Sequence, residues 1–321
     1  MGGQTFKPQR SGTWLVRIGV MGAGAVGSLV GAILSGTHEV VLVGREAHVR
    51  AINESGLRVT GLTDMLARPQ ASTDAAELAG CDVVLLTVKS YDTAEAAEEV
   101  ALAEPRALLV SLQNGLDNGE RIAEAAPGMR AALAVTSLGV TFMGPGHVHH
   151  AGAGSTQLGR FACTEAQARA AAAALTAGGL PVDFKRGMRG YVWLKGIVNH
   201  CINPLTVIHR CTNGALLEVP ERYEQMQVLC EEAVEAVRAA RISIPDSDPF
   251  ARVEEVARLT ATNRSSMLQD VERGRRTEID SITGHIIAVG RAHGVGLPLS
   301  ERVLREVKAA EALALGAAAP G

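Results

Sequence analysis

The sequence predicts an α/β domain followed by an all-helical domain, and two patterns carry this prediction. Between residues 15 and 185, short apolar runs that end at glycine or polar residues alternate with helical stretches, as buried parallel strands do. From Tyr191 onward, stretches rich in Ala, Leu and Glu and separated by Gly and Pro predict helices and no strand. We therefore expect one domain at 1–187 and a second at 188–321, with a hinge at 187–190 and a flexible polar arm at 1–13.

Composition restricts the class of protein. The 321 residues are 47% hydrophobic, so the chain can bury a substantial core. A formal net charge of −3 argues against a general nucleic-acid binder. The five cysteines are odd in number and lack CxxC spacing, which predicts free thiols in a reducing compartment and no metal site. Residues 18–37 carry no charge, but their glycines and internal position argue against a membrane span, so we expect a soluble cytoplasmic protein.

A glycine-rich turn lies between the first two expected strands. An apolar run at 15–21 precedes it, a helix to about Ser35 follows, and a strand at 39–44 closes the unit. The turn has the pattern GxGxxG and consists of Gly22, Ala23, Gly24, Ala25, Val26 and Gly27. Such a turn lets a pyrophosphate approach the backbone at the start of a helix, whose N–H groups and dipole favour anions. The pattern predicts a Rossmann-like dinucleotide-binding domain.

The residue that follows the second strand indicates the cofactor. An NAD enzyme usually has Asp or Glu there, to accept a hydrogen bond from the ribose 2′-hydroxyl. This chain has Arg45, whose guanidinium suits the 2′-phosphate of NADP. The next residue is Glu46, so NAD stays open, but the sequence favours NADP.

Two further buried strands, at 82–88 and 107–112, end in polar residues. Ligands of open α/β sheets bind beyond the carboxyl ends of the strands, where Lys89 and Asn114 are expected. The alternatives are a solvated lysine at a helix start and an ordinary Asn-Gly turn.

Other strands are expected as a possible pair within 57–72, in the region 130–160, and at 181–185. The region 130–160 carries His147, His149 and His150, for which an exposed strand or loop is expected in preference to a metal site, because no nearby carboxylate or cysteine completes a ligand set.

Three polar side chains recur every fourth residue in an otherwise apolar stretch of the second domain. Lys195, Asn199 and Asn203 are therefore expected on one face of a buried helix. A buried lysine is costly unless it is paired or neutral, so this face is a candidate site. The alternative is a lysine that reaches water from a helix start, with asparagines that are merely tolerated. Pro204 disfavours helical geometry at Asn203, so the helix is expected to kink or end there.

Further helices are expected at about 218–241 and 248–271, after a turn at Asn213. Thr277 and Asp280 resemble a capping pair for the last long helix, which would put Glu278 in its first turn. Plain capping is the alternative to a functional role for Glu278.

Taken together, these segments resemble the ketopantoate reductase family (2-dehydropantoate 2-reductases). The resemblance extends from about residue 17 to 310 and rests on the GxGxxG turn with Arg45 and on the stretches VKSYDT, SLQNGL, WLKGIVNHCINPLT, TNGAL, NRSSMLQD and RRTEID. It implies a site in the cleft between a Rossmann-like domain and a helical domain.

The resemblance also implies a role for each candidate residue. Lys195 would be the catalytic acid, and Glu278 would be the partner of lysine and substrate and a neighbour of the cofactor. Asn114 would lie at the nicotinamide ribose and the substrate, and Lys89 near the cofactor. The substrate contacts would be Asn199, Asn203 and Ser266, with Asn213 at a cleft position.

The activity implied is NADPH-dependent reduction of ketopantoate to (R)-pantoate in pantothenate and coenzyme A biosynthesis. Reduction of another branched 2-oxo acid is the alternative within enzymes, and a non-catalytic NADP-binding sensor is the alternative from another class. The apolar helices of the second domain make a homodimer plausible.

Overall fold

An eight-stranded sheet organises the first part of the chain. The computed structural model describes residues 15–318. The strands have the order β12-β11-β8-β7-β6-β1-β2-β5, and those from β8 to β5 are all parallel. β11 pairs antiparallel with β8 and parallel with β12. The strands are β1 (Arg17–Met21), β2 (Glu39–Val43), β5 (Gln70–Ser72), β6 (Val83–Leu86), β7 (Leu108–Ser111), β8 (Arg130–Thr136), β11 (Thr156–Ala162) and β12 (Val182–Phe184). From β5 to β8 this is the doubly wound order, which reverses between β1 and β6, and the expected Rossmann-like fold is confirmed.

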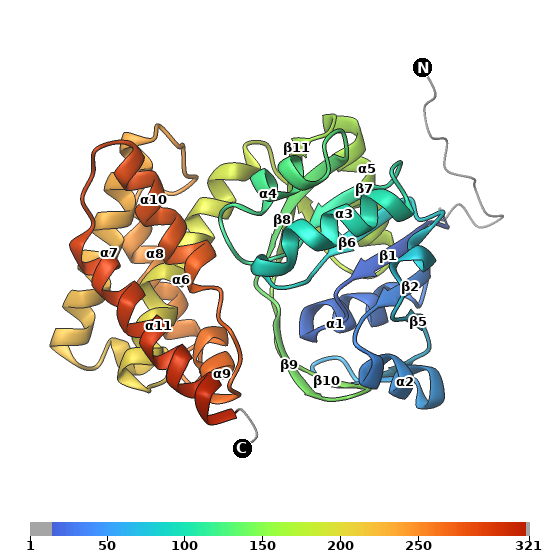
Figure 1. The fold of residues 1–321 in the computed structure, drawn as a ribbon, viewed down its shortest axis with the longest axis horizontal. Helices are drawn as coiled ribbons and strands as arrows, with labels where there is room; N and C mark the ends of the chain where they lie inside the picture. Colours follow the sequence, from blue (N-terminus) through green and yellow to red (C-terminus); the bar gives the residue numbers. More distant parts are fainter. Residues whose placement is uncertain (1–14, 319–321) are drawn as a thin grey trace. The chain divides into compact units, whose positions relative to one another are not determined.

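Helices cover both faces of this sheet. α1 (Ala25–Leu34) and α5 (Glu165–Ala177) share one apolar cluster, whereas α3 (Thr93–Ala103) and α4 (Asn118–Ala125) share another and lie side by side (Figure 1). Successive strand residues point to opposite faces, so Leu85 belongs to the first cluster and its neighbours Val84 and Leu86 to the second. Burial on both faces explains why these strands are continuous apolar runs. The remaining helical segments of this part are α2 (Glu46–Ser55), η1 (Ala75–Leu78) and η2 (Ser90–Asp92).

A second, smaller sheet packs against α1 and has the order β4-β3-β10-β9. Its strands are β3 (Leu57–Gly61), β4 (Met65–Ala67), β9 (Gly139–Gly144) and β10 (His147–Gly152). The three histidines of the HxHH stretch lie on β10, but His150 is buried, so the expectation of exposure is wrong for it. The hydroxyl of Thr60 bonds to the rings of His147 and His149, at 3.0 and 3.1 Å. Within the described part of the chain, no group of three or more His, Cys, Asp or Glu side chains could hold a metal ion.

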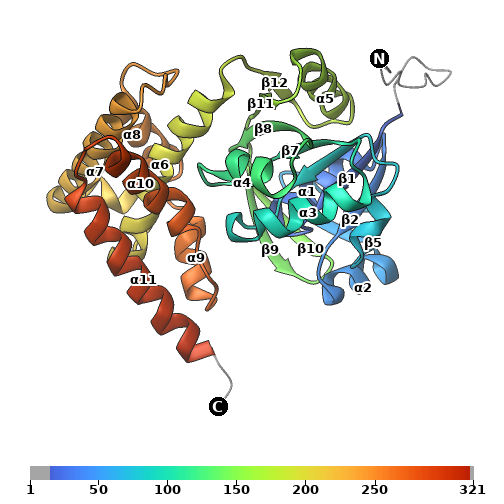
Figure 2. The ribbon, with the colours of Figure 1, turned by 45° about the horizontal axis from the view of Figure 1, so that its top comes forward.

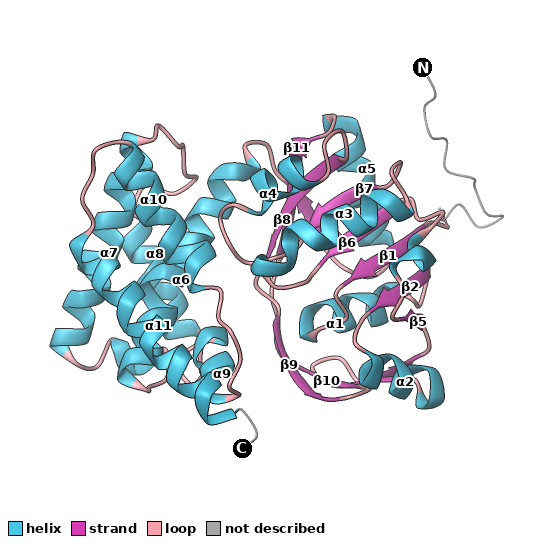
Figure 3. Cartoon of the chain, viewed as in Figure 1, coloured by secondary structure: helices cyan, strands magenta, loops and turns pink. Residues whose placement is uncertain are grey.

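The part of the chain from Met188 to Ala318 is helical, as expected, and Figure 3 shows its described residues without a strand. Its segments are α6 (Met188–His209), η3 (Gly214–Leu216), α7 (Pro220–Ala239), α8 (Pro249–Leu259), α9 (Ser266–Glu272), the π-helical η4 (Asp280–Gly284), α10 (His285–Ala292) and α11 (Pro298–Ala318). The long α11 packs against α7, α9 and η4, and its course beside α9 is visible in Figure 2. Among residues 15–318, no helix is both long and apolar enough to cross a membrane.

The chain divides into two compact units, which do not follow the sequence strictly. One unit consists of the chain up to Gln113 and of Asn118–Met188. The other consists of Asn114–Asp117 and of the chain from Arg189 onward. A short loop from the first half of the sequence, with Asn114 at its start, therefore belongs to the helical unit.

Some local details of the helical part differ from the expectations. α6 does not end at Asn203 but continues through Pro204 to His209, and the hydroxyl of Thr206 donates to the Asn203 carbonyl at 2.7 Å. Almost all of this stretch is buried, so tertiary packing outweighs the local preference against helix before proline. The helical stretch expected at 248–271 is two helices, α8 and α9, separated by a turn. The boundary between the two units lies between Met188 and Arg189, inside the stretch expected as a hinge. The first turn of α6 already begins there, and Gly187 stays outside a helix with φ +67°. The arm expected at 1–13 lies outside the described residues.

The expected capping pair is also wrong. η4 begins after Ile279 without a side-chain cap, and Glu278 precedes the first turn. The Thr277 hydroxyl accepts a hydrogen bond from Ile279 N, and the Asp280 carboxylate binds Lys308.

Candidate active site

The glycine-rich turn connects β1 to α1 and leaves space where a phosphate would lie. Gly22 has φ +107°, which L side chains rarely adopt, and a Cβ at Gly27 would lie 2.4 Å from the Gly22 carbonyl oxygen. Gly24 is exposed, and a Cβ there would come no closer than 4.0 Å to any atom. α1 has no acidic residue in its first turn and no side chain that caps it. The open backbone and the free helix start fit a pyrophosphate.

Arg45 and Lys89 lie at the ends of the two strands beside this turn. Val43, the last residue of β2, accepts hydrogen bonds from the backbone N–H groups of Gly22 and Ala23, and Arg45 follows two residues later as an exposed side chain. On the other side the Thr87 hydroxyl donates to the Gly22 carbonyl at 2.7 Å, two residues before the half-buried Lys89. Both cations therefore belong to the same edge of the sheet as the glycine-rich turn.

The sequence reasoning missed Gln113, which joins the ends of β6 and β7. Its amide donates to the Val88 carbonyl at 3.0 Å and to the Thr93 hydroxyl at 2.8 Å, and it accepts from Ser111 at 3.0 Å. Gln113 is buried, so these bonds hold the strand ends that carry Lys89 and Asn114. In the sequence, the one sign of this role is that Gln113 is a second amide side chain, directly before Asn114.

In the helical unit, the structure brings three predicted residues into one hydrogen-bonded row. Lys195 Nζ donates to Asn114 Oδ1 at 2.8 Å, and Asn114 Nδ2 donates to Glu278 Oε2 at 3.4 Å. The Asn114 amide thus presents its acceptor to the ammonium and its donor to the carboxylate. Residues that are 81 and 164 positions apart in the sequence meet in this row.

Lys195 is half-buried, and this partial burial tunes its charge. Removal from water lowers the pKa of its ammonium from 10.5 to about 8, although the negative charge of Glu278 acts in the opposite direction. A lysine with a pKa near 8 is protonated at neutral pH and still able to release its proton, as a general acid must.

Backbone contacts fix the loop of Asn114 and the segment of Glu278 to each other. Leu116 N donates to the Ser281 carbonyl at 3.0 Å, and the N–H groups of Ser281 and Ile282 donate to the Glu278 carbonyl. Gly196 gives the loop room on α6, because a Cβ there would lie 2.3 Å from the Leu116 side chain. The π-helical turn directly after Glu278 is of a rare kind that is frequent at functional sites.

Two further predicted residues continue along α6. Asn199 is half-buried and Asn203 is buried, and neither side-chain amide makes a hydrogen bond to any residue that the structure describes. The Thr206 hydroxyl bonds at 2.6 Å to Ser265, which caps α9 through Leu268 N. This bond connects α6 to the start of α9, where Ser266 is exposed. Ser265 is thus a buried support that the sequence reasoning missed, although a serine before a helix is a common N-cap.

Asn213 is placed differently. Its Nδ2 donates to the Thr260 hydroxyl at 2.8 Å and its backbone N–H to the Asn263 carbonyl at 3.0 Å, while its Oδ1 is buried without a hydrogen-bond partner in the described residues. These contacts hold the loop that leads to Ser265 and Ser266, and within the described residues no hydrogen bond joins Asn213 to the row of Lys195.

Family models match nearly the whole described chain. The model "Ketopantoate reductase PanE/ApbA" matches residues 18–162, and "Ketopantoate reductase PanE/ApbA C terminal" matches residues 187–311. The chain belongs to the ketopantoate reductase family. As a member of the ketopantoate reductases it is an oxidoreductase acting on a CH–OH group, and the family and the glycine-rich turn together indicate a nicotinamide dinucleotide cofactor.

Relatives and solved structures agree with this membership of the ketopantoate reductases. The 2-dehydropantoate 2-reductases of Halobacterium salinarum and Archaeoglobus fulgidus are 35% and 33% identical, and the matches cover 92% of this chain and 99% and 98% of those proteins. The crystal structure of a PanE/ApbA family ketopantoate reductase from Ralstonia eutropha JMP134 is similar with a TM-score of 0.87 and 33% identity, over 93% of this chain and 99% of that one. D-mandelate dehydrogenase with NADH and anilino(oxo)acetate has a TM-score of 0.86 at 24% identity, over 93% of this chain and 99% of that one, which shows a common fold.

Proposed function

We propose that this ketopantoate reductase family member reduces 2-dehydropantoate to (R)-pantoate with NADPH, as a step of pantothenate and coenzyme A biosynthesis. The observation that supports this most is the row of Lys195, Asn114 and Glu278, which joins an acid of lowered pKa to an amide and a carboxylate. The full-length similarity to proteins named 2-dehydropantoate 2-reductase supports the choice of substrate.

The chemistry assigned to Lys195 is that of a general acid. Bound NADPH supplies a hydride to C2 of the 2-oxo acid. The former carbonyl oxygen then carries a developing negative charge, which the Lys195 ammonium stabilises before it gives that oxygen a proton and becomes a neutral amine. The Asn114 Oδ1 acceptor fixes the direction of the ammonium. A positioned general acid contributes roughly 10²–10⁴-fold to the rate.

The other polar side chains are assigned to the substrate. Glu278 accepts from the 4-hydroxyl of ketopantoate or orients Lys195, and the exposed hydroxyl of Ser266 donates to the substrate carboxylate. The amides of Asn199 and Asn203 have donors and acceptors to offer, since they have no hydrogen-bond partner in the described residues. For Asn213 the contacts with Thr260 and Asn263 favour an indirect role, through the loop before Ser266.

The cofactor assigned is NADPH. The glycine-rich turn at 22–27 would hold the pyrophosphate, and Lys89 would lie near it. The exposed Arg45 guanidinium would bind the 2′-phosphate, since it makes no ion pair with any described residue. Asn114 and Glu278 would complete the surroundings of the nicotinamide.

The decisive experiment is the oxidation of NADPH by the purified protein with ketopantoate, compared with NADH and with other branched 2-oxo acids. We expect the highest kcat/KM for ketopantoate with NADPH. A higher kcat/KM for another 2-oxo acid would show that this acid, and not ketopantoate, is the substrate. The absence of turnover with every 2-oxo acid would favour a non-catalytic NADP-binding sensor. Light scattering tests the expected homodimer.

Lys195→Ala tests the assigned acid. It should lower kcat by roughly 10²–10⁴-fold and leave the Kd for NADPH nearly unchanged. Near-normal turnover of a folded Lys195→Ala variant would rule out Lys195 as the acid.

A further inference from the structure

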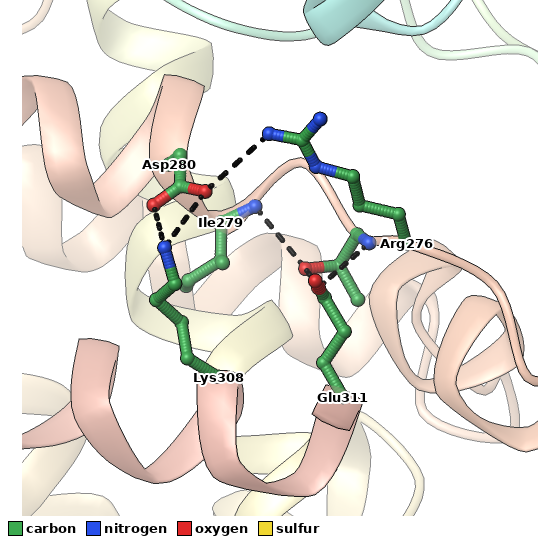
Figure 4. Close-up of polar contacts among 6 residues, drawn as sticks. Arg276, Ile279, Asp280, Lys308 and Glu311 are labelled. Atoms are coloured by element: carbon green, nitrogen blue, oxygen red, sulfur yellow. Dashed lines mark hydrogen bonds and ion pairs between the residues drawn. The ribbon is translucent and has the colours of Figure 1, made fainter. Parts of the chain in front are cut away.

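The short segment that carries Glu278 is fastened to the C-terminal helix α11. Glu311 Oε2 accepts two hydrogen bonds from Thr277, one from the backbone N–H at 2.8 Å and one from the hydroxyl at 2.7 Å. The Thr277 hydroxyl in turn accepts from Ile279 N at 3.3 Å, so it closes a turn around Glu278. Figure 4 shows the Glu311 side chain reaching this segment, with the bond from Ile279 N drawn beside it.

The residues after Glu278 are held by the same helix. Ile279 is fully buried in an apolar cluster with Val307 of α11. Lys308 Nζ donates to both carboxylate oxygens of Asp280, at 2.8 and 3.1 Å, as Figure 4 shows. The side chains on either side of Glu278 thus contact α11, whereas the Glu278 carboxylate accepts a hydrogen bond from Asn114.

We propose that Glu311 is a positioning residue, which fixes the Thr277 turn and thereby holds the Glu278 carboxylate against Asn114 beside Lys195. Within the described residues Glu311 makes no hydrogen bond or ion pair with any of the three, so it acts through the backbone of the turn. This inference deepens the proposed function and rests on it for the role of Glu278.

The burial of Glu311 is the reason to assign this role to it and not to Lys308. The exposed fraction of Glu311 is 9%, and its oxygen satisfies two donors of buried Thr277, so loss of the carboxylate would leave both unpaired. The Lys308 and Asp280 side chains are 51% and 40% exposed, and such surface pairs contribute little.

Displacement of the Glu278 carboxylate should change the pKa of Lys195 measurably. Glu278 is the charged group that raises the pKa of Lys195 against the effect of burial. Movement of its carboxylate away from the row would therefore lower the pKa of Lys195 below about 8. A residue that only stabilises the fold would leave this pKa unchanged.

The test measures the Lys195 pKa by NMR of isotope-labelled lysine side chains in Glu311→Ala and Glu311→Gln. The chain has five lysines, Lys7, Lys89, Lys185, Lys195 and Lys308. The NMR signal that is lost in Lys195→Arg is the signal of Lys195. Glu311→Ala should lower the Lys195 pKa and reduce kcat/KM roughly tenfold to a hundredfold, with an unchanged Kd for NADPH. Glu311→Gln keeps an acceptor oxygen and should stay close to the wild type. Glu306→Ala, on an exposed face of the same helix, is the matched control.

A double variant separates positioning from general destabilisation. In a Glu278→Gln background, Glu311→Ala should produce no further fall in the Lys195 pKa. A folded Glu311→Ala variant with an unchanged Lys195 pKa, or a fall that adds fully to that of Glu278→Gln, would overturn the proposal. If Glu311→Ala does not fold, Thr277→Val replaces the hydroxyl by a methyl group and keeps the backbone N–H that binds Glu311. This variant should lower the Lys195 pKa by a smaller amount, and an unchanged pKa would also overturn the proposal.

The NMR measurement does not depend on activity. If the wild type fails to reduce ketopantoate but Glu311→Ala still lowers the Lys195 pKa, the positioning role stands and the proposed substrate falls. If the wild type is active and the pKa does not move, the positioning role falls and the proposed function stands.

Discussion

Exchange of Glu278 for glutamine should move the alkaline limb of the pH–rate profile to lower pH. Burial brings the Lys195 pKa from 10.5 to about 8, which corresponds to about 3 kcal/mol against the charged form at 1.36 kcal/mol per pKa unit. Glu278 opposes this effect with its negative charge. Glutamine removes the charge but can still accept from Asn114, so the ammonium loses electrostatic support and its pKa falls.

The expected size of the change follows from the closeness of the two groups. A nearby opposite charge shifts a pKa by roughly one to three units, so we expect the limb at about pH 8 to fall by about one unit in Glu278→Gln. Initial rates of NADPH oxidation with ketopantoate, taken on both sides of pH 8, give kcat/KM for the free enzyme. Glu306→Gln, an exposed carboxylate of α11, should leave the limb in place. A limb that is unchanged or moves to higher pH in Glu278→Gln would refute the assignment of this limb to Lys195.

Three further predictions concern the cofactor site and the helical core. Arg45→Ala should raise the KM for NADPH roughly tenfold, which corresponds to about 1.4 kcal/mol of binding free energy, and should leave the KM for NADH unchanged. Steady-state kinetics with both cofactors would show this, and equal changes in the two KM values would contradict a role in binding the 2′-phosphate. Gly27→Ala should destabilise the protein by about 1–3 kcal/mol, because its Cβ would lie 2.4 Å from a carbonyl oxygen, whereas Gly24→Ala meets open space and should weaken NADPH binding without a fall in the unfolding temperature. Burial lowers the pKa of His200 to about 4, so the stability that its neutral ring contributes is fully present above pH 6.5 and is lost as the pH falls from about 6.5 to about 4. Denaturant unfolding over this range should show a loss of about 3 kcal/mol in the free energy of unfolding of the wild type, and this loss should be missing in His200→Gln. Equal pH dependence of the free energy of unfolding in both proteins would contradict this.

Features that depend on neighbouring residues could be predicted well from the sequence. The bounds of the two strands that flank the glycine-rich turn were predicted within a residue or two. Turn geometry requires a particular glycine spacing and buried parallel strands require apolar runs, so both features can be recognised in a short stretch of sequence. The 3.6-residue period likewise placed Lys195, Asn199 and Asn203 on one helix.

Features that depend on distant partners were predicted less well. Thr277 looks like a helix cap in sequence, but Glu311, 34 positions later, takes its two donors. The helix through Pro204 persists because nearly every residue around it is buried, and this packing is absent from a local preference. In both cases a tertiary contact outweighed a local rule.

The sequence by itself determined the family, the order of the α/β part and the helical part, and the candidate residues, because these are encoded in local patterns and short motifs. Only the tertiary structure decided which candidates meet. It assigned the Asn114 loop to the helical unit, joined Lys195 and Glu278 through the Asn114 amide, and lowered the Lys195 pKa by burial. A hydrogen bond requires atoms within about 3 Å, and the packing of helices supplies that precision between residues far apart in the chain.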